Sequence, residues 1–245
     1  MNDSPARALT AEAIGTFALC FIGILSISTD AITGGAGTST LTTVALAHGL
    51  TIAVMVAALA AHSGAHFNPA VTAGFVATGR MGPARGAQYV AAQLAGAVLA
   101  SLLLAWLFGR DVVAAGTPVV TPTVHPLGGA AVEVMTTFFL VLVIFGTAVD
   151  DRAPRSIFPI AIGLTVVLDI MATGPITGAA MNPARAMGPA LVAWVWEAHW
   201  VYWVGPLLGG IAAAFLQHSF FLAHAPSPET AVRGGTAPSE ERGAP

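Results

Sequence analysis

The sequence contains two copies of one short pattern, HFNPAVTAG at residues 66–74 and AMNPARAMG at residues 180–188. Each copy opens an apolar segment with Asn-Pro-Ala. Both segments, 68–79 and 182–193, are too short to cross a bilayer, which needs about 20 apolar residues. Asparagine is a common helix N-cap and proline is favoured at the first helical position, so one copy alone would be weak. Two copies, each preceded by a glycine-containing segment, predict a pair of half-helices.

The rest of the chain has the composition of a membrane protein. Its 245 residues are 56% hydrophobic and 9% charged, with a mean hydropathy of +0.78, values far from those of a soluble domain. The first apolar stretch carries Glu12 in its interior, which favours a retained span over a cleaved signal peptide. Six stretches are long enough to span the bilayer, at residues 8–29, 41–61, 84–108, 128–149, 157–174 and 199–223.

The chain also repeats internally. AEAIGTFAL at residues 11–19 matches VEVMTTFFL at residues 132–140. Three spans per half is an odd number, so the second half must enter the membrane inverted, and the two half-helices enter from opposite faces. The sequence therefore predicts an all-α membrane protein with six transmembrane helices and two re-entrant half-helices in an inverted three-plus-three repeat. We expect a channel domain over residues 1–224, with repeats at about 8–110 and 128–224.

Charge predicts the orientation and excludes some functions. The chain has nine arginines and no lysine, which leaves no basic stripe for nucleic acid. Under the six-span topology, seven of the arginines lie on the same side of the membrane as the two termini, and only Arg110 and Arg185 do not. The positive-inside rule therefore places both termini in the cytoplasm. The arginine-only, alanine-rich composition suggests a bacterial plasma membrane. The tail at residues 225–245 is rich in Pro, Gly, Ser and Glu, and we expect it to be disordered.

The sequence predicts a channel and not an enzyme. Cys20 is the only cysteine, so no disulfide framework or CxxC metal site is possible, and we expect it to be buried. The chain has no HExxH zinc pattern and no GxSxG nucleophile elbow. We therefore expect no catalytic residues, no metal and no cofactor.

The half-helices predict a pore that repels cations. Two helix N-termini that meet at the bilayer midplane aim their positive dipole ends at one point. Each asparagine can cap its own helix and still turn N–H donors toward a lumen. Irregular backbone at this depth must be buried or line a wet cavity, where its carbonyls would form a row of acceptors. The predicted motif residues are Asn68, Pro69, Ala70, Asn182, Pro183 and Ala184, and the predicted pore-lining backbone comprises Gly64, Ala65, His66, Gly178 and Ala180.

SGAHFNPAVT and GAAMNPARAMGP closely resemble the aquaporins, or major intrinsic proteins, and the resemblance runs from Glu12 to about Leu222. It implies a right-handed six-helix bundle, a pore for water through each subunit, and a homotetramer.

Arg185 is the strongest candidate for a selectivity residue. An ionisable group inside the membrane is usually functional, although an arginine near a helix end can also snorkel to the surface. By resemblance, Arg185 narrows the outer pore together with His48, Ile170 and Ala179. This set departs from the Phe and His of many strict water channels. It resembles the plant tonoplast intrinsic proteins and the ammonia-permeable animal branch, which implies passage of ammonia, hydrogen peroxide or urea beside water.

Three acidic residues lie inside the predicted spans. Glu12 and Glu133 occupy equivalent places in the repeat, and an unpaired buried carboxylate is costly. The family resemblance implies that they accept hydrogen bonds from the backbone before the half-helices. A proton relay is the alternative. Asp169 either bonds a neighbouring helix or supports the filter from behind.

Two other transport functions compete with a water channel. Glycerol facilitators usually carry an acidic residue directly after Asn-Pro-Ala-Arg and a basic one four places later, where this chain has Ala186 and Ala190. The small Ala179 could still widen the filter for glycerol or urea. A proton-coupled secondary transporter also uses inverted repeats and broken helices, and it would need coupling groups at the midplane.

Overall fold

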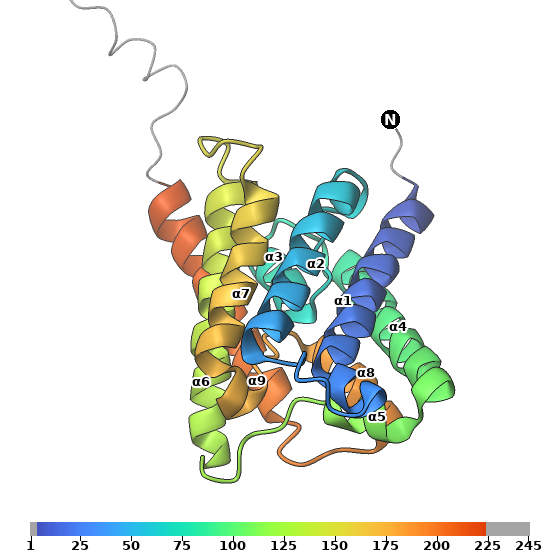
Figure 1. The fold of residues 1–245 in the computed structure, drawn as a ribbon. Helices are drawn as coiled ribbons and strands as arrows, with labels where there is room; N and C mark the ends of the chain where they lie inside the picture. The colour runs from blue at the N-terminus through green and yellow to red at the C-terminus, as the bar shows by residue number, and fades with distance from the viewer. Residues whose placement is uncertain (1–3, 224–245) are drawn as a thin grey trace, which may run out of the picture.

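The computed structural model describes residues 4–223, and every regular element among them is helical (Figure 1). Six helices in this range are long and apolar enough to cross a membrane, which confirms the predicted fold class. The spans are α1 (Pro5–Thr33), α2 (Leu41–Ser63), α4 (Pro83–Phe108), α6 (Pro126–Ile144) with the π-helix η1 (Phe145–Val149), α7 (Phe158–Thr177), and α9 (Val201–Leu216) with the π-helix η2 (Gln217–Leu222). The half-helices are α3 (Pro69–Ala77) and α8 (Pro183–Ala193), and a short α5 (Arg110–Ala115) follows α4. The predicted tail at 225–245 lies outside the described residues.

Several boundaries differ from the sequence prediction. Helix α1 begins at Pro5, three residues early, because Ser4 is extended and Pro5 fits the first helical position. Helix α7 continues past Pro175 to Thr177 and ends at Gly178, which adopts the left-handed conformation at φ 78°. Helix α5 was not predicted, because its six residues are too few for a hydrophobic period to show.

The two ends of the described chain lie at the same end of the bundle, which we call the inner end, and α5 lies at the opposite, outer end (Figure 1). Helix α1 packs on α4 in the first repeat, as α6 packs on α9 in the second, and α2 packs on α7 between the repeats. Each half-helix packs against the last span of the other repeat, α3 on α9 and α8 on α4. The two repeats are therefore interlocked.

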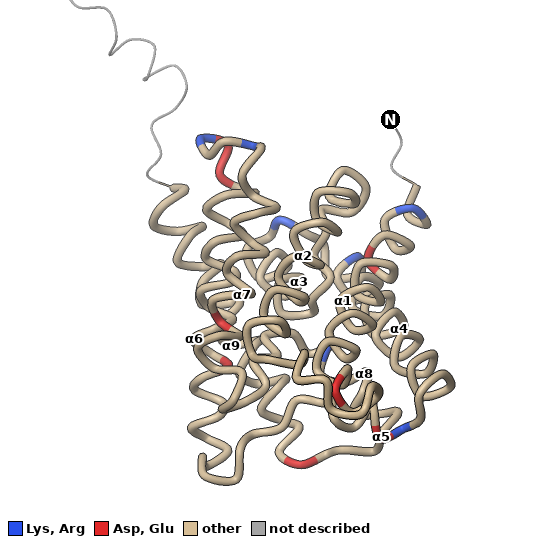
Figure 2. Tube along the Cα trace, viewed as in Figure 1, with Lys and Arg blue, Asp and Glu red and all other residues tan. Residues whose placement is uncertain are grey.

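Charged residues lie mainly toward the two ends of the bundle, and the loop between η1 and α7, at the inner end, carries both signs (Figure 2). Cys20 is buried, as predicted. Large apolar side chains are exposed on the outer faces of the spans, among them Leu50, Leu102, Leu168 and Leu208. These faces suit a lipid environment, where apolar surface has no cost.

Glycines let the spans approach one another closely. A Cβ at Gly96 would lie 2.2 Å from the carbonyl oxygen of Ala13, and one at Gly209 would lie 2.1 Å from that of Val134. These equivalent crossings join α1 to α4 and α6 to α9. Backbone cannot move aside as a side chain can, so any side chain at either glycine must separate the helices.

We expect Gly209→Ala to lower the unfolding free energy by about 1–3 kcal/mol, because the added methyl overpacks a backbone contact. Thermal unfolding of the detergent-solubilised protein measures the change. Gly128→Ala is the matched control, since its Cβ would meet only the Val124 side chain, at 3.3 Å. Equal unfolding temperatures for the two variants would contradict the close-packing role of Gly209.

Candidate functional site

The N-termini of the two half-helices meet in the interior, where each asparagine makes two kinds of bond. The Asn68 Oδ1 accepts from Ala70 N at 2.8 Å, and the Asn182 Oδ1 accepts from Ala184 N at 3.0 Å. The Asn68 Nδ2 donates to the Met181 carbonyl, and the Asn182 Nδ2 donates to the Phe67 carbonyl, both at 2.8 Å. Each asparagine thus caps its own helix and binds the loop that precedes the other. Pro69, Ala70, Pro183 and Ala184 are the buried first residues of these helices.

A buried carboxylate holds the loop before α3. Glu12 is fully buried, and its oxygens accept from the His66 and Phe67 amides at 2.9 and 2.7 Å. The Ser63 hydroxyl and the Gln93 amide nitrogen also donate to it, at 2.7 and 2.8 Å. Four donors therefore surround one carboxylate, which offsets the cost of burying it.

Glu133 repeats this arrangement before α8. It is also fully buried, and it accepts from the Ala180 and Met181 amides at 2.9 and 2.7 Å and from the Thr177 hydroxyl at 2.7 Å. It has one donor fewer than Glu12 because Pro206 stands in the repeat position of Gln93. The two loops are therefore held in the same way by the first helix of each repeat.

Both loops contain residues in the left-handed conformation. Ala65 and Phe67 have φ of 53° and 50°, and Ala179 and Met181 have φ of 43° and 51°. Such a conformation costs a non-glycine residue about 1–2 kcal/mol. The amides of Phe67 and Met181 are bound by the carboxylates, so these hydrogen bonds hold the strained backbone in place.

Two cavities meet at the predicted filter. The inner cavity, of about 170 Å³, is lined by residues 64–68 and 179–182, among others. The outer cavity, of about 490 Å³, is lined by residues 115–119, by Gly178 and by the ends of α1, α2 and α7. Both cavities reach His48, Ile170 and Arg185. These three side chains therefore lie between the two cavities.

The hydrogen bonds of His48 identify its tautomer. Its Nδ1 lies 2.8 Å from the Val44 carbonyl oxygen, which can only accept, so Nδ1 carries the proton and Nε2 is an acceptor. The Arg185 Nη2 lies 3.5 Å from that Nε2. The Arg185 Nη1 is buried and has no hydrogen-bond partner within residues 4–223. The filter therefore offers an unused donor beside a histidine nitrogen.

Several residues of this site were missed in the sequence. Ser63 and Thr177 bind the carboxylates, and the hydroxyls of Tyr89 and Tyr202 both donate at 2.8 Å to the carbonyls of Ser63 and Thr177. Their equivalent places in the repeat were the signal that could have identified them. Asp169 does not line either cavity, and its buried Oδ2 has no partner in the described chain.

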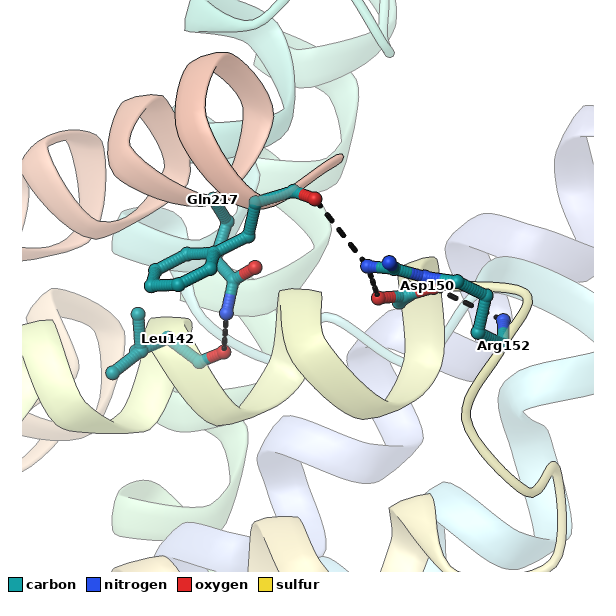
Figure 3. Close-up of polar contacts among 5 residues, drawn as sticks. Leu142, Asp150, Arg152 and Gln217 are labelled. Carbon is teal, nitrogen blue, oxygen red and sulfur yellow. Dashed lines mark hydrogen bonds and ion pairs between the residues drawn. The ribbon is translucent and has the colours of Figure 1, made fainter. Parts of the chain in front are cut away.

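The loop between η1 and α7 borders the inner mouth of the passage. Val149 and Phe158, at its two ends, line the inner cavity. Arg152 binds Asp150 through two bonds, of 2.8 and 2.5 Å, and donates to the Phe221 carbonyl at 3.3 Å (Figure 3). Gln217 adds a second tie from η2, to the Leu142 carbonyl of α6 at 3.1 Å (Figure 3). The mouth is thereby tied to the last helical segment.

We expect Glu133→Gln to destabilise the fold by about 1–3 kcal/mol, because an amide NH2 would face a backbone donor and leave it unsatisfied. Thermal unfolding in detergent measures this loss. Glu197→Gln is the control, since Glu197 is exposed. An unfolding temperature for Glu133→Gln equal to that of the control would show that the carboxylate does not hold the loop.

We expect Arg152→Ala to speed hydrogen exchange of the amides at residues 150–157, because the tie to Phe221 is lost. Arg155→Ala is the control, since within residues 4–223 Arg155 pairs only with the exposed Asp151 and the Ala148 carbonyl. Hydrogen bonds from Arg152 lower the pKa of Asp150 to about 2. Because this pKa is lowered, the pair of Asp150 and Arg152 is fully stabilising at every pH above the ordinary pKa of an aspartate. Hydrogen exchange of these amides, corrected for intrinsic rates, should therefore not change between about pH 5 and about pH 7. Unchanged exchange in Arg152→Ala would rule out the tie.

Comparison with known proteins agrees with this geometry. The family model described as Major intrinsic protein matches residues 2–217. Aquaporin TIP4-4 of Zea mays is 48% identical to this chain, over 91% of this chain and 90% of its own length. Aquaporin NIP1-1 of the same plant is 42% identical, over 84% of this chain and 72% of its own length. A solved structure, the aquaglyceroporin from Plasmodium falciparum, covers 90% of this chain and 98% of its own, with a TM-score of 0.77 and 24% identity, and so shares the fold.

The family match extends over most of the chain and includes both half-helices, the first five spans and α9 of the sixth. The chain belongs to the major intrinsic protein family, the aquaporin channels of membranes.

Proposed function

We propose that this protein is a passive water channel that also passes small neutral solutes, ammonia and hydrogen peroxide among them, and excludes protons and ions. The observation that carries the proposal is the position of His48, Ile170 and Arg185, which line both cavities, together with Ala179, which lines the inner cavity. The names of the relatives, aquaporins of the TIP and NIP groups, support the assignment to water.

Exclusion of cations follows from the charges along the passage. The positive ends of two helix dipoles meet at Asn68 and Asn182, and the buried guanidinium of Arg185 adds a full positive charge nearby. Each asparagine Nδ2 uses one hydrogen on the opposite loop, which leaves one for the lumen. Water beside these donors must present its oxygen to both, so it cannot pass a proton along a continuous chain of hydrogen bonds.

Passage of ammonia follows from the chemistry of the filter. Ammonia can accept a hydrogen bond from the Arg185 Nη1 as it crosses, beside the His48 Nε2, which faces the Arg185 Nη2. Ile170 gives an apolar wall and Ala179 occupies little space. Hydrogen peroxide can likewise accept a hydrogen bond from this donor. Ala186 and Ala190, where glycerol facilitators carry charged residues, favour water over glycerol.

The homotetramer and the plasma membrane belong to the proposal as well. The exposed apolar faces of the spans can be covered by lipid or by neighbouring subunits, and the family resemblance implies four subunits. The plasma membrane rests on the arginine-only composition alone, while the named relatives include plant TIP aquaporins.

Two assays on proteoliposomes test this function. Stopped-flow shrinkage measures water, and the alkalinisation of an enclosed pH-sensitive dye after an ammonium gradient measures ammonia. We expect both rates to exceed those of protein-free vesicles of equal size. We expect His48→Phe to reduce ammonia passage by roughly tenfold and water passage less, because the ring removes an acceptor and narrows the filter. We expect Arg185→Ala to increase urea permeability above that of the wild type and to weaken cation exclusion.

The opposite outcomes are distinct. If the protein-containing vesicles shrink and alkalinise no faster than protein-free vesicles, the proposal of a channel is wrong. Fast passage of water without passage of ammonia would show that the channel is limited to water. Faster passage of glycerol than of water would favour a glycerol facilitator. Solute accumulation against a gradient, driven by protons, would indicate a secondary transporter instead.

A further inference from the structure

We propose that Gly23 of α1 is the positioning residue of the filter, because its missing side chain leaves the space that the His48 imidazole occupies. Gly23 touches no permeant and acts through His48. This inference rests on the proposed function, since it assumes that His48 borders the path of the permeant.

Gly23 of α1 lies directly against the imidazole of His48. A Cβ built at Gly23 would lie 2.4 Å from Nε2, 2.9 Å from Cδ2 and 3.0 Å from Cε1 of His48. The three atoms are the outer edge of the imidazole, so the ring abuts the α1 backbone. A non-bonded carbon contact needs about 3.5 Å. Any side chain at residue 23 would therefore displace the ring by about 1 Å.

The ring has other fixed neighbours. Its Nδ1 is held at 2.8 Å by the Val44 carbonyl of its own helix, and its Nε2 faces the Arg185 Nη2 at 3.5 Å. His48 is 3% exposed. A ring pushed away from α1 must either break the bond to Val44 or move toward the junction of the two cavities. Either movement changes the width of the filter or the direction of its acceptor.

The second repeat supports a link between the glycine and the histidine. The repeat offset for the first helix is 121 residues, Glu133 minus Glu12, which pairs Gly23 with Ile144. The offset for the second helix is 114, Asn182 minus Asn68, which pairs His48 with Ile162. Ile144 and Ile162 are buried and line the inner cavity. The fold thus accepts a large side chain at the place of Gly23 when no imidazole lies opposite.

The packing glycines behave differently. Gly96 and Gly209 occupy equivalent positions in the two repeats, and a Cβ on either would overlap with backbone atoms of the neighbouring helix. The nearest atoms to Gly23 all belong to one side chain. A side chain can shift where backbone cannot, so Gly23→Ala should fold and alter transport, whereas Gly209→Ala should impair folding.

The test compares four proteins in proteoliposomes, the wild type, Gly23→Ala, His48→Ala and the double variant, each measured for water and for urea. We expect Gly23→Ala to lower permeability per channel by roughly tenfold for urea and less for water. In the His48→Ala background the same change should have an effect of less than about twofold, because no ring remains to be displaced. Gly82→Ala is the matched control, since nothing lies within 4 Å of its Cβ and its φ is −67°.

The outcomes separate this inference from the proposed function. A wild type that passes no water would overturn the proposed function itself. A wild type that passes water, with Gly23→Ala reducing permeability equally in both backgrounds or in neither, would overturn the positioning role. If Gly23→Ala alone fails to fold, recovery of folding in the double variant would support the role, and failure of both would overturn it.

Discussion

The structure depends on one interaction made twice, the hydrogen bonds from two consecutive backbone amides of each re-entrant loop to one buried carboxylate. Irregular backbone inside a membrane has no water to bind, so each free amide would cost several kcal/mol. Glu12 and Glu133 satisfy these amides and hold Phe67 and Met181 in the left-handed conformation. The carboxylates thereby fix where each half-helix begins. The two asparagines can then reach across to the carbonyls of the opposite loop.

The functional features lie where the two repeats differ. The scaffold is nearly identical in both, from the carboxylates to the tyrosines that bind the ends of α2 and α7. The repeat position of Arg185 is Val71, and that of His48 is Ile162. Both of these apolar residues line the inner cavity. Although the two halves come from inverted repeats related by a pseudo-two-fold axis, only the outer half carries the polar residues of the predicted filter.

The sequence predicted the fold and the two half-helices well, because each depends on a pattern that extends over many residues. Hydropathy located six spans, and the duplicated Asn-Pro-Ala located both half-helices. Helix α5 and the π-helical segments were missed, because they are short or share the apolar pattern of an α-helix. Gly23 and the tie from Arg152 to Phe221 were also missed, because each depends on a contact between distant parts of the chain.

The unpartnered donor of Arg185 links the energetics of the fold to the choice of permeant. A buried N–H without an acceptor costs about 1–3 kcal/mol, and this one lies where the two cavities meet. A permeant with a lone pair accepts a hydrogen bond from this donor and so removes the cost as it enters. A permeant without a lone pair leaves the donor unsatisfied. Because Arg185 lines both cavities, the penalty applies where the two cavities meet. Under the proposed function, the arginine discriminates twice, against cations by its charge and against apolar molecules by its unsatisfied hydrogen bond.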